Sequence, residues 1–311
     1  MLATPGGEAT RPTGRSFALQ HVALPCEAPI RGHSGCHVAI EETDDGVVVV
    51  KSAVDPAYNE RLRRQVAKQM NARALNTLRF VRIPCILSEG VVDGCYRATM
   101  EYVYFDNAIR YFSSASQRGV RAVTDMLIAY VDDHVRSSPV ALQSVLPLQQ
   151  KVQDVATELS GGEFYGLYRP HLRALEDDLE RRPVIELPVG AGHGDLTFSN
   201  IMIASDCEAL ALIDFLDSYL ESPVIDLAKL RQDTRFYWTV LMTDTAVDRV
   251  RYVQVMRCID CAIESTYGDV SWYTDNIDLI LRINMLRIAP YARSDGMHGF
   301  IADSLATIER S

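Results

Sequence analysis

The sequence has no hydrophobic stretch long enough to cross a membrane as a helix. Such a helix needs about 18 consecutive apolar residues, and no run in the 311 residues approaches that length. The first residues, MLATPGGEATRPTGRS, also have neither the basic start nor the apolar core of a signal peptide. Their proline, glycine and threonine content predicts a disordered lead-in over residues 1–16. We therefore expect a cytoplasmic protein with no membrane partner.

Positive charge is in deficit. The chain has 31 Lys and Arg residues against 41 Asp and Glu residues, so its formal net charge is −10. A protein that binds nucleic acid needs a basic face for the phosphate backbone, and the charge balance argues against that class of partner. The hydrophobic share of 48% and the charged share of 23% are ordinary for a globular protein.

The sequence offers little evidence for disulfides. The cysteines number seven, which is odd, and they are scattered in a chain with no export signal, so we expect free thiols. Cys258 and Cys261 form the one Cys-x-x-Cys pair, in a stretch of helical pattern. A redox or metal role would need a second pair or a thioredoxin-like context, so we interpret both as buried core thiols.

The most informative stretch is residues 191–217, AGHGDLTFSNIMIASDCEALALIDFLD. Two apolar runs separated by a turn-forming Ala-Ser-Asp-Cys predict a β-hairpin. Asn200 stands directly before the first strand and Asp214 directly after the second, so a hairpin brings the two together. Asp195 lies on the loop that leads into the hairpin.

These three oxygen-bearing side chains form the set that phosphoryl transfer from a nucleotide needs. Mg²⁺ takes oxygen ligands and usually keeps the phosphates of its substrate in its shell. A separate carboxylate orients the attacking hydroxyl and accepts its proton. His-Gly-Asp alone is a weak signal, because any turn can carry it, but the whole pattern is much rarer.

The order H-G-D-x-x-x-x-N, followed by a strand that ends in I-D-F, resembles the aminoglycoside phosphotransferase and choline kinase family, relatives of the protein kinases. The resemblance implies that Asp195 is the catalytic base, that Asn200 and Asp214 hold Mg²⁺, and that His193 braces the catalytic loop. It also implies ATP or GTP as the phosphoryl donor and a small molecule as the acceptor.

Two other functions stay open. A protein kinase would have a glycine after Asp214-Phe215 and a recognisable activation segment, and the sequence has neither. A pseudokinase scaffold would bind nucleotide without turnover, and the intact Asp195, Asn200 and Asp214 argue against that.

The resemblance implies an α+β, two-lobe protein-kinase-like fold with a strand-rich N-lobe and a mostly helical C-lobe. Residues 17–103 read mostly as strands with one helix, and we expect them to form the nucleotide-covering N-lobe. Residues 104–311 are rich in helical pattern and would form the C-lobe with the catalytic loop and the acceptor site. No internal repeat is visible.

Lys51 ends the β-branched run GVVVVKSA, which predicts a buried strand. A lysine at this place can put its charge on the nucleotide phosphates, and the resemblance favours that role over a solvated strand end. A small-residue turn ahead of it would cover the phosphates with backbone N–H groups, and its candidates are Gly32, Ser34 and Gly35. A plain hairpin turn is the alternative.

A helix is predicted to follow, with Asn59 as its N-cap. In the family this helix carries a glutamate that holds the lysine. Glu60 is its only acidic residue but comes early, whereas Gln69 lies closer to the expected place, so both stay open.

The stretches VRIPCILSEG and CYRATMEYVY then read as two more strands. The second ends where kinases join their lobes. The resemblance therefore places the backbone groups that bind the adenine edge at Glu101 and Val103.

Two aspartates follow the hairpin. Asp217 could contact the cation or the acceptor, or it could cap the next turn. Asp226 stands in Pro-Val-Ile-Asp-Leu-Ala, which resembles the P-x-x-D-L-A segment of the family, and the resemblance implies that it braces the catalytic loop.

The fold does not fix the acceptor. A choline-like cation would want an aromatic cage, but the aromatic residues near the C-terminal half have the spacing of a helix core: Phe236, Tyr237, Trp238, Trp272 and Tyr273. No dense acidic cluster for a polycationic drug is evident either. These absences favour a sugar or polyol, with amino alcohols such as choline and aminoglycosides as alternatives.

Overall fold

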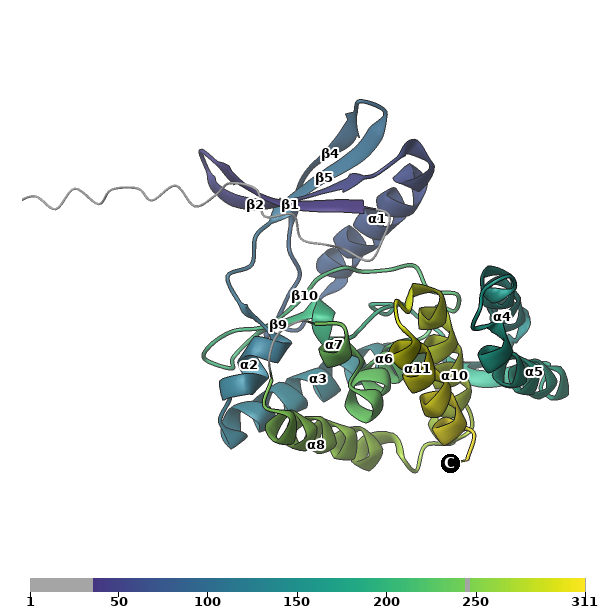
Figure 1. The fold of residues 1–311 in the computed structure, drawn as a ribbon. Coiled ribbons are helices and arrows are strands. Elements are labelled where there is room, and N and C mark those ends of the chain that lie inside the picture. Colours follow the sequence, from purple (N-terminus) through teal and green to yellow (C-terminus); the bar gives the residue numbers. More distant parts are fainter. Residues whose placement is uncertain (1–35, 244–246, 311) are drawn as a thin grey trace, which may run out of the picture.

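The computed structural model describes residues 36–243 and 247–310, which fold into two lobes (Figure 1). Four antiparallel strands in the order β1-β2-β5-β4 form the sheet of the small lobe, and one helix lies against it. These elements are β1 (Cys36–Thr43), β2 (Gly46–Ala53), α1 (Asn59–Leu75), β4 (Ile86–Val92) and β5 (Cys95–Glu101). The rest is mostly helical, which confirms the α+β, two-lobe fold.

Tight turns set the register of the small sheet. The loop between β1 and β2 has two residues and ends at Gly46, whose φ of 126° favours glycine. The loop between β4 and β5 is Asp93-Gly94, and both residues have positive φ, as a two-residue hairpin turn requires. In β2, Val48 and Val50 alternate toward the interior.

Helix α1 packs an apolar stripe onto this sheet. Leu62 and Val66 are buried in a small core with Tyr96 and Ala98 of β5. Burying an aliphatic side chain of this kind contributes about 1.5–3 kcal/mol. The stripe fixes which face of α1 turns toward the large lobe.

The start of α1 differs from the prediction, because Asn59 is not its N-cap. A 3₁₀ turn (Pro56–Tyr58) precedes the helix, and Asp55 caps that turn. The Asn59 side chain instead accepts a hydrogen bond from the Tyr96 N–H at 2.7 Å and donates one to the Gly94 carbonyl at 2.8 Å. A tertiary contact therefore takes the side chain away from local capping.

One predicted strand is divided between two sheets. The stretch VRIPCILSEG forms β3 (Val81–Arg82) and then, beyond Pro84, β4. Proline has no N–H to continue a ladder. Strand β3 pairs in parallel with β10 in a sheet of the large lobe, and Val81 packs in the large-lobe core. The chain thus enters the large lobe before residue 103, and the division at 103/104 stays a prediction.

The large lobe contains two small sheets. The first has the order β3-β10-β9-β6, and the second is the pair β7-β8. Their strands are β6 (Asp106–Asn107), β7 (Val140–Ser144), β8 (Val184–Pro188), β9 (Ile201–Ile203) and β10 (Leu210–Leu212). The pair β9-β10 is antiparallel, so the hairpin predicted from residues 191–217 is confirmed.

Helices make up most of the large lobe (Figure 1). They are α2 (Ala108–Ser114), α3 (Gln117–Ser137), α4 (Leu146–Leu159), α5 (Tyr165–Arg181), α6 (Pro223–Phe236), α7 (Trp238–Leu241), α8 (Arg249–Tyr267), α9 (Ser271–Thr274), α10 (Ile277–Ile288) and α11 (Asp295–Ile308). Helix α6 lies against α3, α8 and α10, and nearly all its residues are buried, including the charged Asp226, Lys229, Arg231 and Asp233.

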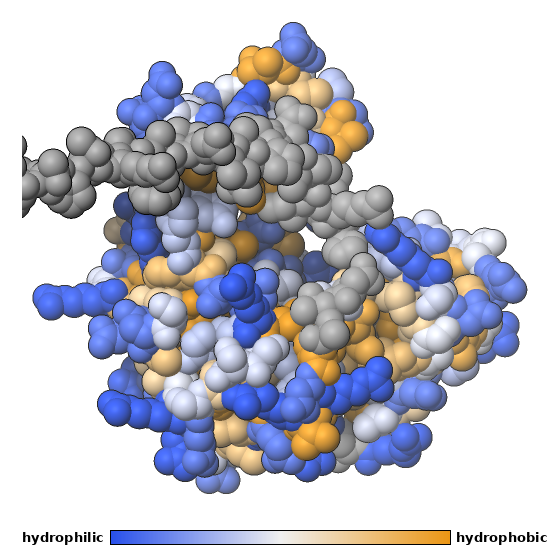
Figure 2. Space-filling model, turned by 60° about the vertical axis from the view of Figure 1, so that its left-hand side comes forward, coloured by the Kyte–Doolittle hydropathy of each residue, from blue (hydrophilic) through white to orange (hydrophobic). Residues whose placement is uncertain are grey.

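On the face shown in Figure 2, hydrophilic side chains are spread over both lobes, and apolar ones gather mainly on the large lobe. Of the five aromatic residues expected in a helix core, Phe236, Trp272 and Tyr273 are buried, and Tyr237 and Trp238 are half-buried against that core. The expected burial of Cys258 and Cys261 is wrong: both thiols are free but exposed on α8.

Within residues 36–243 and 247–310, no helix combines the length and apolarity of a membrane span.

Candidate active site

The hairpin β9-β10 brings Asn200 and Asp214 to the same end. Leu212 faces Ile201 in the ladder, and the Ile213 N–H donates to the Asn200 carbonyl at 3.1 Å. Asp214 follows directly, with a φ of 62° that turns the chain out of the strand. This left-handed conformation is uncommon for a residue other than glycine, and such strain often marks a functional position.

The catalytic loop is anchored to the chain on both sides of Asp214. The His193 Nε2 lies 2.8 Å from the Ile213 carbonyl, and the Leu216 N–H donates to the His193 carbonyl at 3.1 Å. Burial lowers the pKa of His193 to about 4, although the Asp195 charge and the bond to Ile213 oppose that shift. The ring is therefore neutral at pH 7, and its contact with the Ile213 carbonyl ties the loop to the strand end before Asp214.

Gly194 is required at its position. Its φ is 86°, and a Cβ added there would lie 2.1 Å from the Leu216 carbonyl oxygen. Only glycine combines this conformation with so close an approach of two backbone segments. The loop can therefore lie directly against the segment that follows Asp214.

Asp226, near the start of α6, holds the same loop from below. Its carboxylate accepts the N–H of His193 at 2.6 Å and the N–H of Gly194 at 2.8 Å. Burial raises the pKa of Asp226 to about 6, and the two backbone donors act against that rise. The structure thus gives Asp226 the bracing contacts that the resemblance implied.

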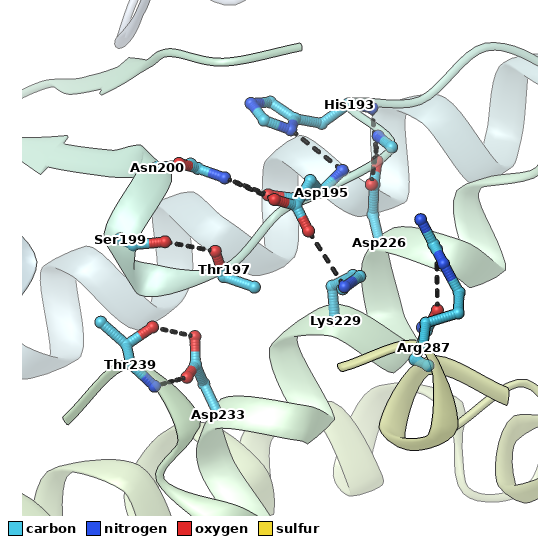
Figure 3. A network of polar contacts seen from close by, with 12 residues as sticks. His193, Asp195, Thr197, Ser199, Asn200, Asp226, Lys229, Asp233, Thr239 and Arg287 are labelled. Carbon is cyan, nitrogen blue, oxygen red and sulfur yellow. Dashed lines mark hydrogen bonds and ion pairs between the residues drawn. The ribbon is translucent and has the colours of Figure 1, made fainter. Parts of the chain in front are cut away.

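The carboxylate of Asp195 is fixed by two partners (Figure 3). The Asn200 side-chain amide donates to Oδ2 at 2.9 Å and to the main-chain carbonyl of Asp195 at 2.8 Å. The Lys229 ammonium lies 3.0 Å from Oδ1. Burial alone would raise the pKa of Asp195, but the charge and hydrogen bond of Lys229 outweigh it and hold the pKa below its ordinary value. The carboxylate is therefore ionised at neutral pH.

Lys51 crosses from the small lobe to the site. It stands in β2, and its ammonium forms an ion pair with Asp214. Burial lowers the pKa of Lys51 to about 8, whereas an adjacent carboxylate favours the charged form. The sequence-predicted residues Lys51, Asp195, Asn200 and Asp214 are thus brought together where the lobes meet.

Residues 37–250, more than half of the chain, match the model of the phosphotransferase enzyme family (APH). The chain belongs to the phosphotransferase enzyme family. It is a small-molecule kinase by that membership. No curated protein matches it.

A solved structure of an aminoglycoside kinase shares the fold of this phosphotransferase. A spectinomycin phosphotransferase in complex with ADP and spectinomycin is 9% identical, with a TM-score of 0.53 over 91% of this chain and 93% of that chain. An aminoglycoside phosphotransferase from Streptomyces rimosus, in complex with ADP and streptomycin, is 19% identical, with a TM-score of 0.48 over 82% of this chain and 93% of that chain.

The expected partner of Lys51 on α1 is absent in this phosphotransferase. Glu60 is exposed at the start of α1 and pairs with Arg63 at 3.2 Å, so the pairing of Glu60 with Lys51 is not formed. Gln69 is buried and donates to the Pro84 carbonyl at 2.9 Å. Neither side chain reaches Lys51. Glu60 lies near the exposed start of α1, and Gln69 lies under the sheet.

Two basic residues of α1 contact the site instead. The Lys68 ammonium donates to the Leu216 carbonyl at 2.9 Å and pairs with Glu221 at 3.1 Å. Arg64 pairs with Asp217 at 2.8 Å, a contact between the lobes that is neither of the two roles expected for that aspartate. The sequence prediction missed both contacts because it looked for an acidic residue on this helix.

The two positions predicted to bind the adenine edge differ in whether their backbone groups already form hydrogen bonds. The Glu101 N–H already donates to the Cys85 carbonyl at 2.9 Å, and the Glu101 carboxylate pairs with Arg82. Val103 is buried in the irregular segment after β5, and no hydrogen bond within the described part of the chain uses its backbone. Val103 is thus the better candidate.

The phosphate-covering candidates Gly32, Ser34 and Gly35, like the lead-in 1–16, lie outside the described residues.

Helix α6 supplies two polar contacts that the sequence prediction missed. One is Lys229, described above. The other is Asp233, which accepts the Phe198 N–H at 2.7 Å and the Thr239 N–H at 2.6 Å, so it holds the turn that carries Asn200. Burial raises the pKa of Asp233 to about 6. With Asp226, these residues stand three and seven positions apart, which is one face of a helix and could have been read from the sequence.

Proposed function

We propose that this phosphotransferase moves the γ-phosphoryl group of ATP or GTP to a hydroxyl of a small sugar- or polyol-like acceptor, with Mg²⁺ at the site. The observation that carries the proposal is the arrangement around Asp195. An ionised, hydrogen-bonded carboxylate lies beside Asn200, and Asn200 lies beside Asp214 at the end of one hairpin. The Lys51 ammonium reaches the same place from the other lobe.

The oxygen donors of the site fit Mg²⁺. The amide nitrogen of Asn200 is engaged by Asp195, which leaves its Oδ1 as the atom for a cation. Asp214 adds a carboxylate, and carboxylate and amide oxygens are the ligands that Mg²⁺ accepts while it keeps phosphate oxygens and water. When bound there, the ion would neutralise charge on the nucleotide phosphates. We therefore assign Asn200 and Asp214 as its protein ligands.

The remaining residues bind and orient. Asp195 would accept a hydrogen bond from the acceptor hydroxyl and then its proton, since its lowered pKa keeps it ionised. Lys51 would exchange its contact with Asp214 for the nucleotide phosphates, and Val103 would bind the adenine or guanine edge. Positioning and charge neutralisation supply most of the rate in this kind of reaction.

A sugar or polyol is the favoured acceptor for two reasons. Of the five aromatic residues that could have formed a cage for a choline-like cation, three are buried in the core of the large lobe and two are half-buried against that core. The buried ones are Phe236, Trp272 and Tyr273, and the half-buried ones are Tyr237 and Trp238. The cavity nearest the catalytic segment has a mainly polar and charged lining, which suits a molecule with several hydroxyl groups.

Transfer of label from γ-³²P-ATP or GTP to a panel of small molecules tests the proposal. Asp195→Asn should lower kcat by about 10²–10⁴-fold and leave nucleotide binding nearly unchanged. Asp214→Asn should mainly weaken binding of the Mg²⁺–nucleotide complex, because it removes the only charged metal ligand that we assign. Asp206→Asn, in the exposed turn of the same hairpin, is the matched control and should behave as wild type.

Three results would contradict the proposal. Equal effects of Asp195→Asn and Asp214→Asn on turnover and binding would contradict the assigned roles. Label found only on protein would favour a protein kinase. Nucleotide binding without Asp195-dependent transfer to any acceptor would indicate a scaffold.

A further inference from the structure

A cavity of about 300 Å³ lies beside the catalytic segment, between the two lobes. Helix α1 supplies one wall, α4 and α10 supply another, and the chain after Asp214 forms the third. The charged residues that line it are Arg61, Arg64, Lys151, Asp217 and Arg287.

The cavity adjoins the residues that the proposed reaction uses. Leu216 lines it, and the Leu216 N–H donates to the His193 carbonyl at 3.1 Å, so this wall is bonded to the catalytic loop. Arg287 of α10 lies near Lys229 (Figure 3). Burial raises the pKa of Asp195, and the charge of Arg287 adds to the larger effect of Lys229 that lowers it. A small molecule in the cavity is therefore close to the proposed base.

Four cationic side chains face one carboxylate in this lining. Asp217 is already paired with Arg64 at 2.8 Å. In residues 36–243 and 247–310, no carboxylate forms an ion pair with the other three cations, Arg61, Lys151 and Arg287. An excess of positive charge is thus left facing the cavity, in a chain whose net charge is −10.

The three cations are held near one another by the fold. The Arg287 guanidinium lies over the Tyr219 ring at 5.0 Å and donates to the Asn284 side chain at 3.3 Å. Burial and then the charge of Arg287 lower the pKa of Lys151, the charges of Glu158 and Asp154 on the same helix oppose that shift, and the charge of Arg61 adds to it, so the pKa stays below its ordinary value. Like charges so close to each other are unfavourable until an anion joins them.

We propose that the acceptor carries an anionic group, a phosphate or a carboxylate, which Arg61, Lys151 and Arg287 bind while the acceptor hydroxyl lies at Asp195. The inference rests on the proposed function and adds the charge of the acceptor to it. In the transfer, a bond forms from the hydroxyl oxygen to the γ-phosphorus and the bond from that phosphorus to the nucleoside diphosphate breaks. Asp195 takes the hydroxyl proton.

The charge of the cavity also sets what it rejects. Guanidinium groups bind carboxylate and phosphate with two parallel hydrogen bonds, whereas a polycationic acceptor would meet like charges in the same place. Specificity follows from both terms. An acidic sugar or polyol fits this cavity, and a polyamine-like molecule does not.

Matched acceptor pairs test the proposal with the full-length enzyme. Ribose and ribose 5-phosphate, glycerol and glycerol 3-phosphate, and glucose and glucuronate differ mainly in the anionic group. We expect the anionic member of a pair to have the higher kcat/KM. Lys151→Gln and Arg61→Gln should each lower its kcat/KM by about 10- to 100-fold, as expected for a lost charged hydrogen bond, and change the neutral member less than about 3-fold.

Arg136→Gln removes an exposed cation of α3 and serves as the control, with no change for either member. The KM for ATP should also stay unchanged in Lys151→Gln and Arg61→Gln. A raised KM for ATP would assign the cavity to the nucleotide and overturn the proposal. Both substitutions lie on helix surfaces facing the cavity, and thermal unfolding would report any loss of fold.

Inorganic phosphate separates an acceptor site from a regulatory anion site. Competition of phosphate with the acceptor, lost in Lys151→Gln, supports the proposal, whereas inhibition or activation without competition overturns it. Equal use of neutral and anionic acceptors would also overturn it while leaving the proposed function intact. Absence of Asp195-dependent transfer to every acceptor would reject the proposed function itself.

Discussion

Lys229 is the residue on which the ionisation of Asp195 depends, and replacing it with methionine gives a quantitative test. The ammonium lies 3.0 Å from Asp195, and the Lys229 side chain is 6% exposed. Removing one partner of a buried ion pair costs about 3–5 kcal/mol. Asp195 keeps its hydrogen bond from Asn200 and is 23% exposed, so we expect a loss near the lower end, about 3 kcal/mol.

A loss of this size lowers the melting temperature by about 5 °C in a chain of 311 residues, because the unfolding entropy is about 2.1 cal/mol/K per residue. The substitution should also shift the pH dependence of kcat. Lys229 holds the pKa of Asp195 low against burial, so Lys229→Met lets the pKa rise and the base becomes protonated at a higher pH. The acid limb of the kcat profile should therefore move to higher pH, and raising the pH should recover part of the lost activity.

The assay is the pH profile of kcat together with thermal unfolding. Lys229→Arg keeps the charge and is the matched variant: its acid limb should stay near that of wild type even if packing costs some stability. A lowered melting temperature with an unmoved acid limb would show that Lys229 only stabilises the fold. No change in either quantity would refute the reasoning about the buried pair.

Three other substitutions test the loop and its supports. Gly194→Ala should lower the free energy of unfolding by at least about 2 kcal/mol, because the backbone has a φ of 86° and a Cβ would meet a carbonyl. The control is Gly94→Ala, where φ is 81° but the space around the residue is open. Its loss of stability in urea unfolding measures the backbone strain without the clash. His193 has a folded pKa of about 4 against 6.5, so the stability it contributes is present above pH 6.5 and is lost as the pH falls toward 4, by up to about 3 kcal/mol. Urea unfolding at several pH values should show that the wild type loses this stability relative to His193→Asn, and parallel pH curves would contradict it. Lys68→Met removes the cation that bonds the main chain after Asp214 and should cost about 1.5–3 kcal/mol; a stability equal to wild type in urea would show that this contact does not hold the lobes.

The fold could be predicted where local pattern and tertiary structure agree. The strand run that ends at Lys51 and the hairpin within residues 191–217 are confirmed because their apolar periodicity and turns allow few alternatives. The stretch around Pro84 could not be divided from sequence, since only the parallel pairing with β10 reveals that β3 belongs to another sheet. The capping prediction for Asn59 failed for the same reason: a strand of the sheet competes for its side chain.

The exposed thiols of α8 show that the average burial of a residue type can give a wrong prediction for a single position. Cysteine is often buried, and this favoured a core position for Cys258 and Cys261. The buried residues of the helix, however, include Val255, Met256 and Ile259, and that stripe turns both thiols outward. The stripe was present in the sequence, so the side of the helix could have been predicted from it.

The candidate site likewise contains some residues that could be predicted from the sequence and others that could not. Asp195, Asn200 and Asp214 could be found because their spacing in the chain is fixed by one loop and one hairpin. Lys229 and Lys68 come from helices distant in sequence, and their contacts depend on how α6 and α1 pack. A search for the acidic residues of related kinases passes over them, since both are lysines.

The pattern of ion pairs explains why the base and the nucleotide site should respond differently to change. Asp195 and its partner Lys229 both belong to the large lobe, so the ionised base is prepared whatever the small lobe does. The carboxylates after the hairpin take their cations from the small lobe instead: Asp214 from Lys51, Asp217 from Arg64 and Glu221 from Lys68.

These three pairs fix the small lobe against the segment that holds the proposed metal ligand, and two of them involve exposed side chains that salt screens. Under the proposed assignment an arriving nucleotide would compete directly for Lys51, because its phosphates carry the same sign of charge as Asp214. The pairs made by α1 then keep the lobes in register while Lys51 changes partner. Added salt should therefore weaken nucleotide binding more than it lowers the ionisation of Asp195, since only the nucleotide site is completed by contacts between the lobes.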